Sequence, residues 1–145
     1  MTTPSNVFRI FVVEDNPADV YLLRKALEKA GLKFELTVID DGTKALEFIQ
    51  NESSKTPKPD LAVLDLNLPA NSGIEVLAAI RQNEHLADVP VAVVTSSAAA
   101  VDRSQVELLG VERFITKPPD LGEFLKIGEV LKEVLLGGEP SPAIT

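Results

Sequence analysis

Five short segments rich in β-branched and aromatic residues recur along the chain, and each is followed by a longer segment whose apolar residues have helical spacing. The short segments are residues 8–13, 36–39, 61–64, 91–94 and 112–116. Short runs of this kind are typical of strands buried on both faces of a parallel sheet. Strands that alternate with helices through short connections favour parallel pairing and right-handed crossovers. The alternation therefore predicts a doubly wound α/β domain, in which five helices cover the two faces of a five-stranded parallel sheet.

The intervening segments predict helices at about residues 17–30, 43–50, 72–83, 101–109 and 120–136. The first helix has the clearest boundaries. Asn16 can cap its first turn with a side-chain oxygen, and Gly31 permits the left-handed conformation that ends many helices. A polar, proline-containing stretch at residues 51–59 is expected to be a mobile surface loop. We expect one domain at residues 7–136, with tails at residues 1–6 and 137–145.

The composition excludes several classes of protein. The 145 residues include 22 acidic and 14 basic side chains, for a net charge of −8, and they contain no basic cluster that could bind nucleic acid directly. The absence of cysteine removes disulfides, thiolate metal sites and cysteine nucleophiles. The longest apolar run is five residues, 76–80, so no membrane span is expected, and the N-terminus does not resemble a secretion signal. These observations predict a cytoplasmic protein.

The predicted fifth helix has more apolar surface than one buried face requires. A first stripe, expected to face the core, comprises Leu121, Phe124, Leu125, Gly128, Leu131 and Leu135. A second stripe, well round the helix, comprises Ile127, Val130 and Val134. Two hypotheses remain open for the second stripe. Either it is partly buried under a neighbouring helix or the C-terminal tail, or it forms the self-association surface of a homodimer.

Four of the five predicted strands end in polar side chains that could take part in chemistry. These are Glu14 and Asp15 after the first strand, Asp65 and Asn67 after the third, Thr95 after the fourth and Lys117 after the fifth. Ligands of open parallel sheets bind outside the carboxyl ends of the strands, so these side chains are expected to share one rim. Three carboxylates at one rim repel one another, and a single lysine cannot neutralise them.

A hard divalent cation would relieve this repulsion. Mg²⁺ prefers oxygen ligands, and it commonly binds one or two carboxylates together with water and a phosphate. The acidic set therefore predicts Mg²⁺ and phosphoryl chemistry. Asp65 could act as a nucleophile that attacks phosphorus to form a mixed anhydride. Lys117 and Thr95 would supply the ammonium and hydroxyl donors that stabilise a transferring phosphoryl group.

The motifs around these residues resemble, in order and spacing, the receiver domain of two-component response regulators, the CheY-like family. They are Val-Val-Glu-Asp-Asn at 12–16, Asp-Leu-Ala-Val-Leu-Asp-Leu-Asn-Leu-Pro at 60–69 with Gly73 beyond it, Val-Thr-Ser at 94–96 and Phe-Ile-Thr-Lys-Pro at 114–118. Thr95 lies 30 positions after Asp65, and Lys117 lies 22 positions after Thr95, as the family pattern expects. The match covers about residues 7–136 and implies a flavodoxin-like (βα)5 fold.

The resemblance also implies a metal site and a phosphoacceptor. Asp65 would accept the phosphoryl group. Asp15 and Asp65 would bind Mg²⁺ directly, Glu14 would act through water, and Asn67 would offer its backbone carbonyl. Glu14 departs from the family here, because many members have aspartate at this position.

A switch is implied as well. Thr95 and Lys117 would hold the phosphoryl oxygens, and the added charge would draw Thr95 inward. Phe114 matches an aromatic position whose rotamer is coupled to the Thr95 hydroxyl, so the face formed by the fourth and fifth helices would change shape. Because Phe114 lacks the hydroxyl of the more frequent tyrosine, switching would work through packing alone. The Lys117–Pro118 bond is expected to be cis, as is usual in the family.

As a family member, the chain would receive its phosphoryl group from a sensor histidine kinase or a histidine phosphotransfer protein, and it would act on a downstream protein. It would catalyse only its own phosphorylation and dephosphorylation. No output domain is expected, which resembles the stand-alone receivers. The segment 14–19, Glu-Asp-Asn-Pro-Ala-Asp, is similar to that of receivers paired with phytochrome-type sensor kinases.

Three other functions share either the expected chemistry or the expected fold. An Mg²⁺-dependent phosphohydrolase of the haloacid-dehalogenase class usually has a second aspartate two residues after its nucleophile, where this chain has Asn67. A flavodoxin-like FMN carrier needs a neutral phosphate-binding loop, and Glu14 and Asp15 would repel that phosphate. A phosphorylation-independent adaptor remains an open alternative.

Overall fold

The computed structural model describes residues 7–69, 72–96 and 100–137, and within them the chain forms one parallel sheet of five strands. β1 is Phe8–Val13, β2 is Phe34–Ile39, β3 is Leu61–Leu64, β4 is Val91–Thr95 and β5 is Arg113–Thr116. The strand order across the sheet is β2-β1-β3-β4-β5, and every neighbouring pair is parallel. The predicted doubly wound α/β fold is confirmed.

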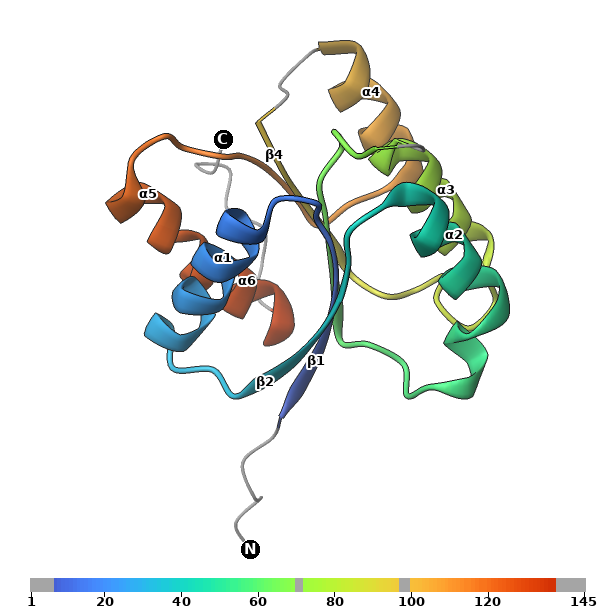
Figure 1. The fold of residues 1–145 in the computed structure, drawn as a ribbon, viewed down its shortest axis with the longest axis horizontal. Coiled ribbons are helices and arrows are strands. Elements are labelled where there is room, and N and C mark those ends of the chain that lie inside the picture. The colour runs from blue at the N-terminus through green and yellow to red at the C-terminus, as the bar shows by residue number, and fades with distance from the viewer. Residues whose placement is uncertain (1–6, 70–71, 97–99, 138–145) are drawn as a thin grey trace, which may run out of the picture.

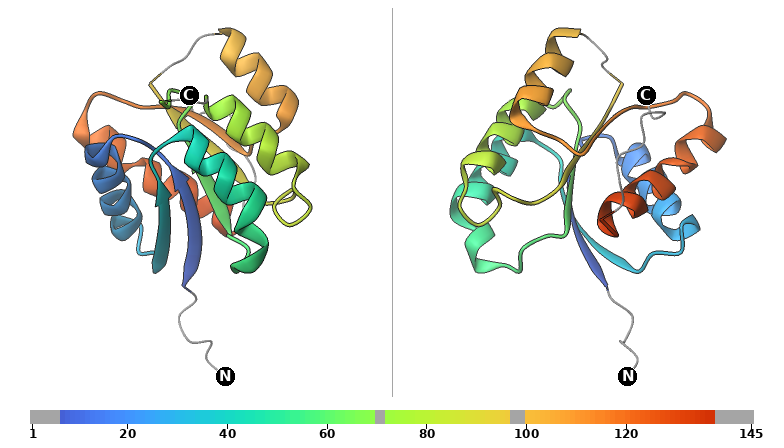
Figure 2. Two further views of the ribbon diagram at one scale, coloured as in Figure 1. Left: turned by 45° about the vertical axis from the view of Figure 1, so that its right-hand side comes forward. Right: turned by 180° about the vertical axis from the view of Figure 1, so that it is seen from behind.

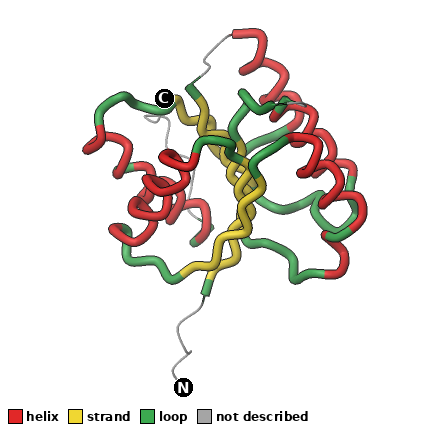
Figure 3. The backbone as a smooth tube through the Cα atoms, in the orientation of Figure 1, coloured by secondary structure: helices red, strands yellow, loops and turns green. Residues whose placement is uncertain are grey.

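Helices cover both faces of the sheet. They are α1 Pro17–Lys29, α2 Gly42–Asn51, α3 Gly73–Gln82, α4 Ala100–Leu109, α5 Leu121–Leu125 and α6 Ile127–Leu135, with a short 3₁₀ helix, η1, at Ser53–Lys55. α1, α5 and α6 lie on one side, and α2, α3 and α4 on the other (Figure 1 and Figure 2). Figure 3 shows the strands running between these two layers. None of the described helices has the length and apolar character needed to cross a membrane.

Each face of the sheet has its own apolar core. Val13 and Leu64 belong to the core under α2, α3 and α4, together with Leu77 of α3. Val12 belongs to the opposite core, together with Leu131 of α6. Successive residues of a strand point to opposite faces, so β1 and β3 contribute to both cores. Burial on both faces explains the continuous apolar runs in the sequence.

The boundaries predicted for the first helix are confirmed. Asn16 caps α1 by accepting a hydrogen bond from the backbone N–H of Ala18 at 2.9 Å, and Gly31 has a φ of 82°. Part of the predicted loop at 51–59 is instead the helix η1. Its first residue, Ser53, is buried, and the hydroxyl donates to the Ile49 carbonyl at 2.7 Å.

The fifth predicted helix is interrupted at Lys126, so it forms two consecutive segments, α5 and α6. The backbone is wound more tightly there. Lys126 N–H donates to Glu123 O, and Lys126 O accepts from Glu129 N–H, both at 3.1 Å and both across three residues. Just beyond, a Cβ atom on Gly128 would lie 2.0 Å from the Ala26 carbonyl oxygen. Glycine therefore allows α6 to approach the backbone of α1 directly.

The buried face of this segment also differs from the prediction. Ile127 and Val134 are 4% and 7% exposed and belong to the core, whereas Leu121 is 56% exposed. The hypothesis that Ile127, Val130 and Val134 form a homodimer surface is wrong, because two of the three are buried within a single chain. The alternative, burial under a neighbouring helix, is confirmed. The true core face follows residues 124, 127, 131 and 134, which are spaced by three and four positions.

Replacing Gly128 with alanine is expected to destabilise the domain by about 1 to 3 kcal/mol, because the new methyl group would force α6 away from α1. Denaturant unfolding followed by circular dichroism measures the loss. Gly122→Ala is the matched control, since its methyl group would meet only the end of the Asp120 side chain, at 3.2 Å. Equal losses in the two variants would show that the close helix contact is not the cause.

Candidate functional site

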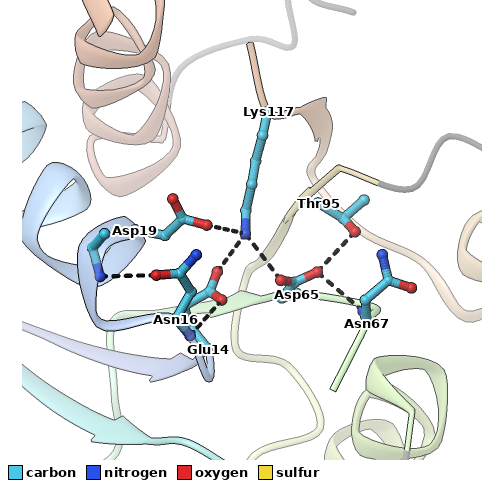
Figure 4. Close-up of polar contacts among 8 residues, drawn as sticks. Glu14, Asn16, Asp19, Asp65, Asn67, Thr95 and Lys117 are labelled. Carbon is cyan, nitrogen blue, oxygen red and sulfur yellow. Dashed lines mark hydrogen bonds and ion pairs between the residues drawn. The ribbon is translucent and has the colours of Figure 1, made fainter. Parts of the chain in front are cut away.

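The predicted rim forms at the carboxyl ends of β1, β3, β4 and β5 (Figure 4). Backbone pairing continues past the strand ends, because Asp65 N–H donates to Val13 O at 3.0 Å and Lys117 N–H donates to Thr95 O at 2.8 Å. These bonds fix the backbone of Asp65 beside β1 and that of Lys117 beside β4. The side chains of Glu14, Asp65, Thr95 and Lys117 consequently point toward one another.

The ammonium group of Lys117 lies at the centre of this cluster. Its Nζ atom is 2.7 Å from Glu14 Oε1, 2.7 Å from Asp19 Oδ2 and 2.9 Å from Asp65 Oδ2. The lysine side chain is only 11% exposed, so the three ion pairs lie largely out of water. Burial lowers the pKa of Lys117, but hydrogen bonds to the three carboxylates outweigh burial and raise the pKa above its ordinary value. Lys117 is therefore a permanent cation in this site.

Donors surround the buried carboxylate of Asp65. Its Oδ1 atom accepts from the Thr95 hydroxyl at 2.8 Å and from the Asn67 backbone N–H at 3.0 Å. Its Oδ2 atom accepts from Lys117. Burial raises the pKa of Asp65, but these bonds together hold the pKa below its ordinary value. Asp65 is thus an ionised carboxylate at neutral pH, the charge state that its predicted role as a nucleophile requires.

Glu14 is also buried, but its proton is held more tightly. Burial is the largest influence and raises the pKa of Glu14 to about 7. The hydrogen bond from Lys117 opposes this change, and repulsion from Asp65 adds to it. Near neutral pH, Glu14 therefore exchanges a proton while Asp65 does not.

Three carboxylates of the rim are close enough to share a cation. Oxygen atoms of Glu14, Asp15 and Asp65 all lie within 4.8 Å of one another, and Asp15 is exposed. These are the hard oxygen donors that Mg²⁺ prefers, and the exposed side leaves room for the water molecules that this ion retains. The residues fit the predicted cation. The role predicted for the Asn67 carbonyl stays a prediction.

Sequence reasoning missed two features of the site. The first is Asp19, which contacts Lys117 from the first turn of α1. A signal was available, because an acid in the first turn of a helix that follows a strand lies close to that strand's carboxyl end. The second is the physical role of Gly73, where a Cβ atom would lie 2.1 Å from the Asp65 carbonyl oxygen. Glycine lets α3 begin directly against the backbone of Asp65.

The residues predicted to form the switch lie at the end of β4 and in β5. Thr95 was expected to be drawn inward by added charge, but its hydroxyl already donates to Asp65. Phe114 is buried, and the guanidinium carbon of Arg103 in α4 lies 4.9 Å from its ring centroid. Its coupling to Thr95 stays a prediction.

The prediction of a cis Lys117–Pro118 bond is wrong, because this bond is trans. The trans isomer is favoured before proline by about 0.5 to 1 kcal/mol. The backbone bond from Lys117 N–H to Thr95 O already places the lysine beside β4 without a cis peptide.

Comparison with known families agrees with this geometry. The family model for the response regulator receiver domain matches residues 10–128 of this chain, and the chain belongs to this family. The response regulator Rcp1 of Synechocystis sp. is 36% identical over 136 residues, which are 92% of this chain and 92% of that protein.

Two solved structures are also similar. The phosphorylated cyanobacterial phytochrome response regulator RcpA is 34% identical, with a TM-score of 0.81 over 90% of this chain and 95% of that chain. The Mn²⁺-bound form of Rcp1 is 34% identical, with a TM-score of 0.79 over 95% of this chain and 97% of that chain. The predicted CheY-like receiver architecture is confirmed.

Glu14→Gln is expected to flatten the pH dependence of stability in the metal-free protein. The pKa of Glu14 is about 7 in the folded chain and close to its ordinary value of 4.5 in the unfolded chain, so the folded chain binds this proton more tightly. The stabilising contribution is full below about pH 4.5 and is lost as pH rises through about 7. At about 1.4 kcal/mol per pKa unit, the loss amounts to about 3 kcal/mol.

Urea unfolding in EDTA, at about pH 5 and about pH 8, measures this difference. Glu28→Gln is the control, because Glu28 lies on the exposed side of α1 and pairs with Lys25, away from the site. It should keep the wild-type profile. A Glu14→Gln profile that falls as steeply as that of the wild type would contradict the raised pKa.

Proposed function

We propose that this chain is a phosphoryl-accepting switch of two-component signalling, with residues 7–136 as the accepting unit. A sensor histidine kinase or a histidine phosphotransfer protein would donate the phosphoryl group to Asp65 in an Mg²⁺-dependent reaction. The environment of Asp65 carries the proposal: a buried but ionised carboxylate contacts an ammonium and a hydroxyl, beside two acids able to share a cation. An acid that merely ended a strand would need none of these neighbours.

The reaction forms a bond between a carboxylate oxygen of Asp65 and phosphorus. It breaks the bond between phosphorus and the donor's histidine nitrogen, which keeps the electron pair. Lys117 and Thr95 already donate to the two oxygens of Asp65, and each is placed to donate to a phosphoryl oxygen once the group arrives. Because the Lys117 ammonium is oriented beforehand, it would need little reorganisation during the transfer.

Asp15 and Asp65 are proposed to bind Mg²⁺ directly, with Glu14 acting through water and Asn67 through its backbone carbonyl. Mg²⁺ held there supplies positive charge beside the transferring group. The clustering of three carboxylate oxygens within 4.8 Å supports this assignment. The Mn²⁺-bound form of Rcp1 supports it as well, and the phosphorylated form of RcpA supports phosphoryl acceptance.

The proposed output passes through Thr95 and Phe114 to the surface formed by α4, β5 and α5. The Thr95 hydroxyl would move from Asp65 Oδ1 to a phosphoryl oxygen, which shifts the end of β4. Phe114 lies beneath Arg103 of α4, so a displacement of α4 changes the packing of the aromatic ring. A downstream protein would bind this altered surface.

The proposed function includes no separate substrate. A phosphohydrolase needs an acid to protonate the leaving group, and Asn67 offers only an amide two residues after Asp65.

The similarity to RcpA, a phytochrome response regulator, supports a phytochrome-type sensor kinase as the donor. We place the protein in the cytoplasm, in keeping with its cysteine-free sequence.

Incubation with acetyl phosphate and MgCl₂ is expected to add one phosphoryl group to the wild type, and none to Asp65→Asn. Intact-mass spectrometry measures the addition. Asp88→Asn is the control, because Asp88 is an exposed acid that pairs with Lys58, away from the site, and it should be modified like the wild type. EDTA should abolish the addition. A folded wild type that stays unmodified would favour the phosphorylation-independent adaptor.

A further inference from the structure

Asp19 contacts the centre of the site from outside the candidate metal cluster. Its Oδ2 atom lies 2.7 Å from Lys117 Nζ, as close as Glu14 Oε1 does (Figure 4). The carboxylate oxygens that can share a cation belong to Glu14, Asp15 and Asp65, and Asp19 is not among them. Asp19 is therefore the one partner of Lys117, among the described residues, that neither cation binding nor phosphorylation would alter directly.

The first turn of α1 holds Asp19 in place. Asn16 caps the helix, and Asp19 is the third residue of the helix that follows this cap. A carboxylate in this turn is stabilised by the free N–H groups and the dipole of the helix. The side chain of Asp19 is 21% exposed, so one side of the carboxylate is hydrated while the other faces Lys117.

The hydrogen-bond capacity of Lys117 gives this contact a consequence. An ammonium group has three N–H donors, and all three are used, toward Glu14, Asp19 and Asp65. With two donors held by Glu14 and Asp19, the third is directed at Asp65 Oδ2. A phosphoryl oxygen on Asp65 would take over this third donor without any rotation of the ammonium group.

We propose that Asp19 is a positioning residue that holds the Lys117 ammonium so that its third N–H donor faces the phosphoryl group on Asp65. This inference rests on the proposed function and deepens it. Glu14 alone is a weaker anchor, because it also belongs to the acidic set that can share a cation. Asp19 keeps the lysine in place when that cation is bound.

A purely electrostatic role for Asp19 leads to the opposite expectation. Asp19 adds a negative charge close to a site that receives an anion, so its removal would then tighten anion binding. A positioning role requires that removal of the acceptor oxygen weaken anion binding. The sign of the change therefore separates the two roles.

Beryllofluoride with saturating Mg²⁺, followed by NMR titration, is the probe for anion binding. Asp19→Ala is expected to bind it about three- to tenfold more weakly than the wild type, the size of effect typical of the net contribution of one hydrogen bond. Asp19→Asn keeps an acceptor oxygen, so its affinity for beryllofluoride should lie between those of the wild type and Asp19→Ala. Glu28→Ala removes an exposed acid from the same helix and should bind like the wild type. Unchanged or tighter binding by Asp19→Ala and Asp19→Asn would overturn the proposal.

A second measurement does not depend on phosphoryl chemistry. In the metal-free protein, the Lys117 Nζ protons should give a slowly exchanging ¹H–¹⁵N signal, because the ammonium is buried and fully hydrogen-bonded. This signal should broaden or vanish in Asp19→Ala and persist in Asp19→Asn. An unchanged signal in Asp19→Ala would overturn the positioning role.

A wild-type protein that shows this signal but does not bind beryllofluoride would instead contradict the proposed function. If Asp19→Ala does not fold, a tighter-binding Asp19→Asn overturns the proposal and a weaker-binding one supports it.

Discussion

One largely buried ammonium group, that of Lys117, holds together the acidic end of this fold. Lys117 comes from the end of β5, and its partners come from β1, α1 and β3, which lie 103, 98 and 52 positions away in the sequence. Charged groups persist out of water only when they are paired and hydrogen-bonded. Without Lys117, the buried acids would bind protons or turn toward solvent. The lysine therefore determines both the charge state and the arrangement of the site.

Packing on both faces of the sheet brings these partners within reach. The central strand, β3, carries Asp65 between β1 and β4. On one face, Gly73 lets α3 start against the backbone of Asp65. On the other, Gly128 lets α6 lie directly on α1, the helix whose first turn carries Asp19. A contact that looks purely structural thus helps to fix the position of a side chain in the site.

The sequence was sufficient to predict the sheet, the rim and most of its acids. Buried parallel strands have a distinctive composition, and their carboxyl ends meet at one edge whatever the details of packing. Glu14, Asp15, Asp65, Thr95 and Lys117 could therefore be predicted to share one rim from the sequence alone. This prediction depends only on which residues end the strands.

Features that depend on packing between helices could not be predicted in the same way. The contact of Asp19 with Lys117 depends on how α1 packs against the rest of the chain, and residues distant in sequence, such as Gly128, contact that helix directly. Apolar residues surround most of α5 and α6, so periodicity alone did not single out the buried face. The isomer of the Lys117–Pro118 bond depends on an energy difference of about 0.5 to 1 kcal/mol, which local sequence does not decide.

The donors of the site are already positioned around Asp65, but the negative charge of the carboxylates is not balanced. Thr95 and Lys117 already face Asp65, yet the carboxylates of Glu14, Asp19 and Asp65 share a single ammonium. Asp15 adds a fourth acid close to Glu14 and Asp65. Burial and the surrounding negative charge raise the pKa of Glu14 to about 7, so a proton binds there when no other positive charge is supplied. A cation bound by the same carboxylates would reduce the same excess of negative charge. The cation and the proton on Glu14 would therefore compete. Because a phosphoryl group adds negative charge, its proposed acceptance would depend on that cation. The proposed metal requirement would thus follow from the charge balance of the rim, since the Asp65 carboxylate is ionised without the cation.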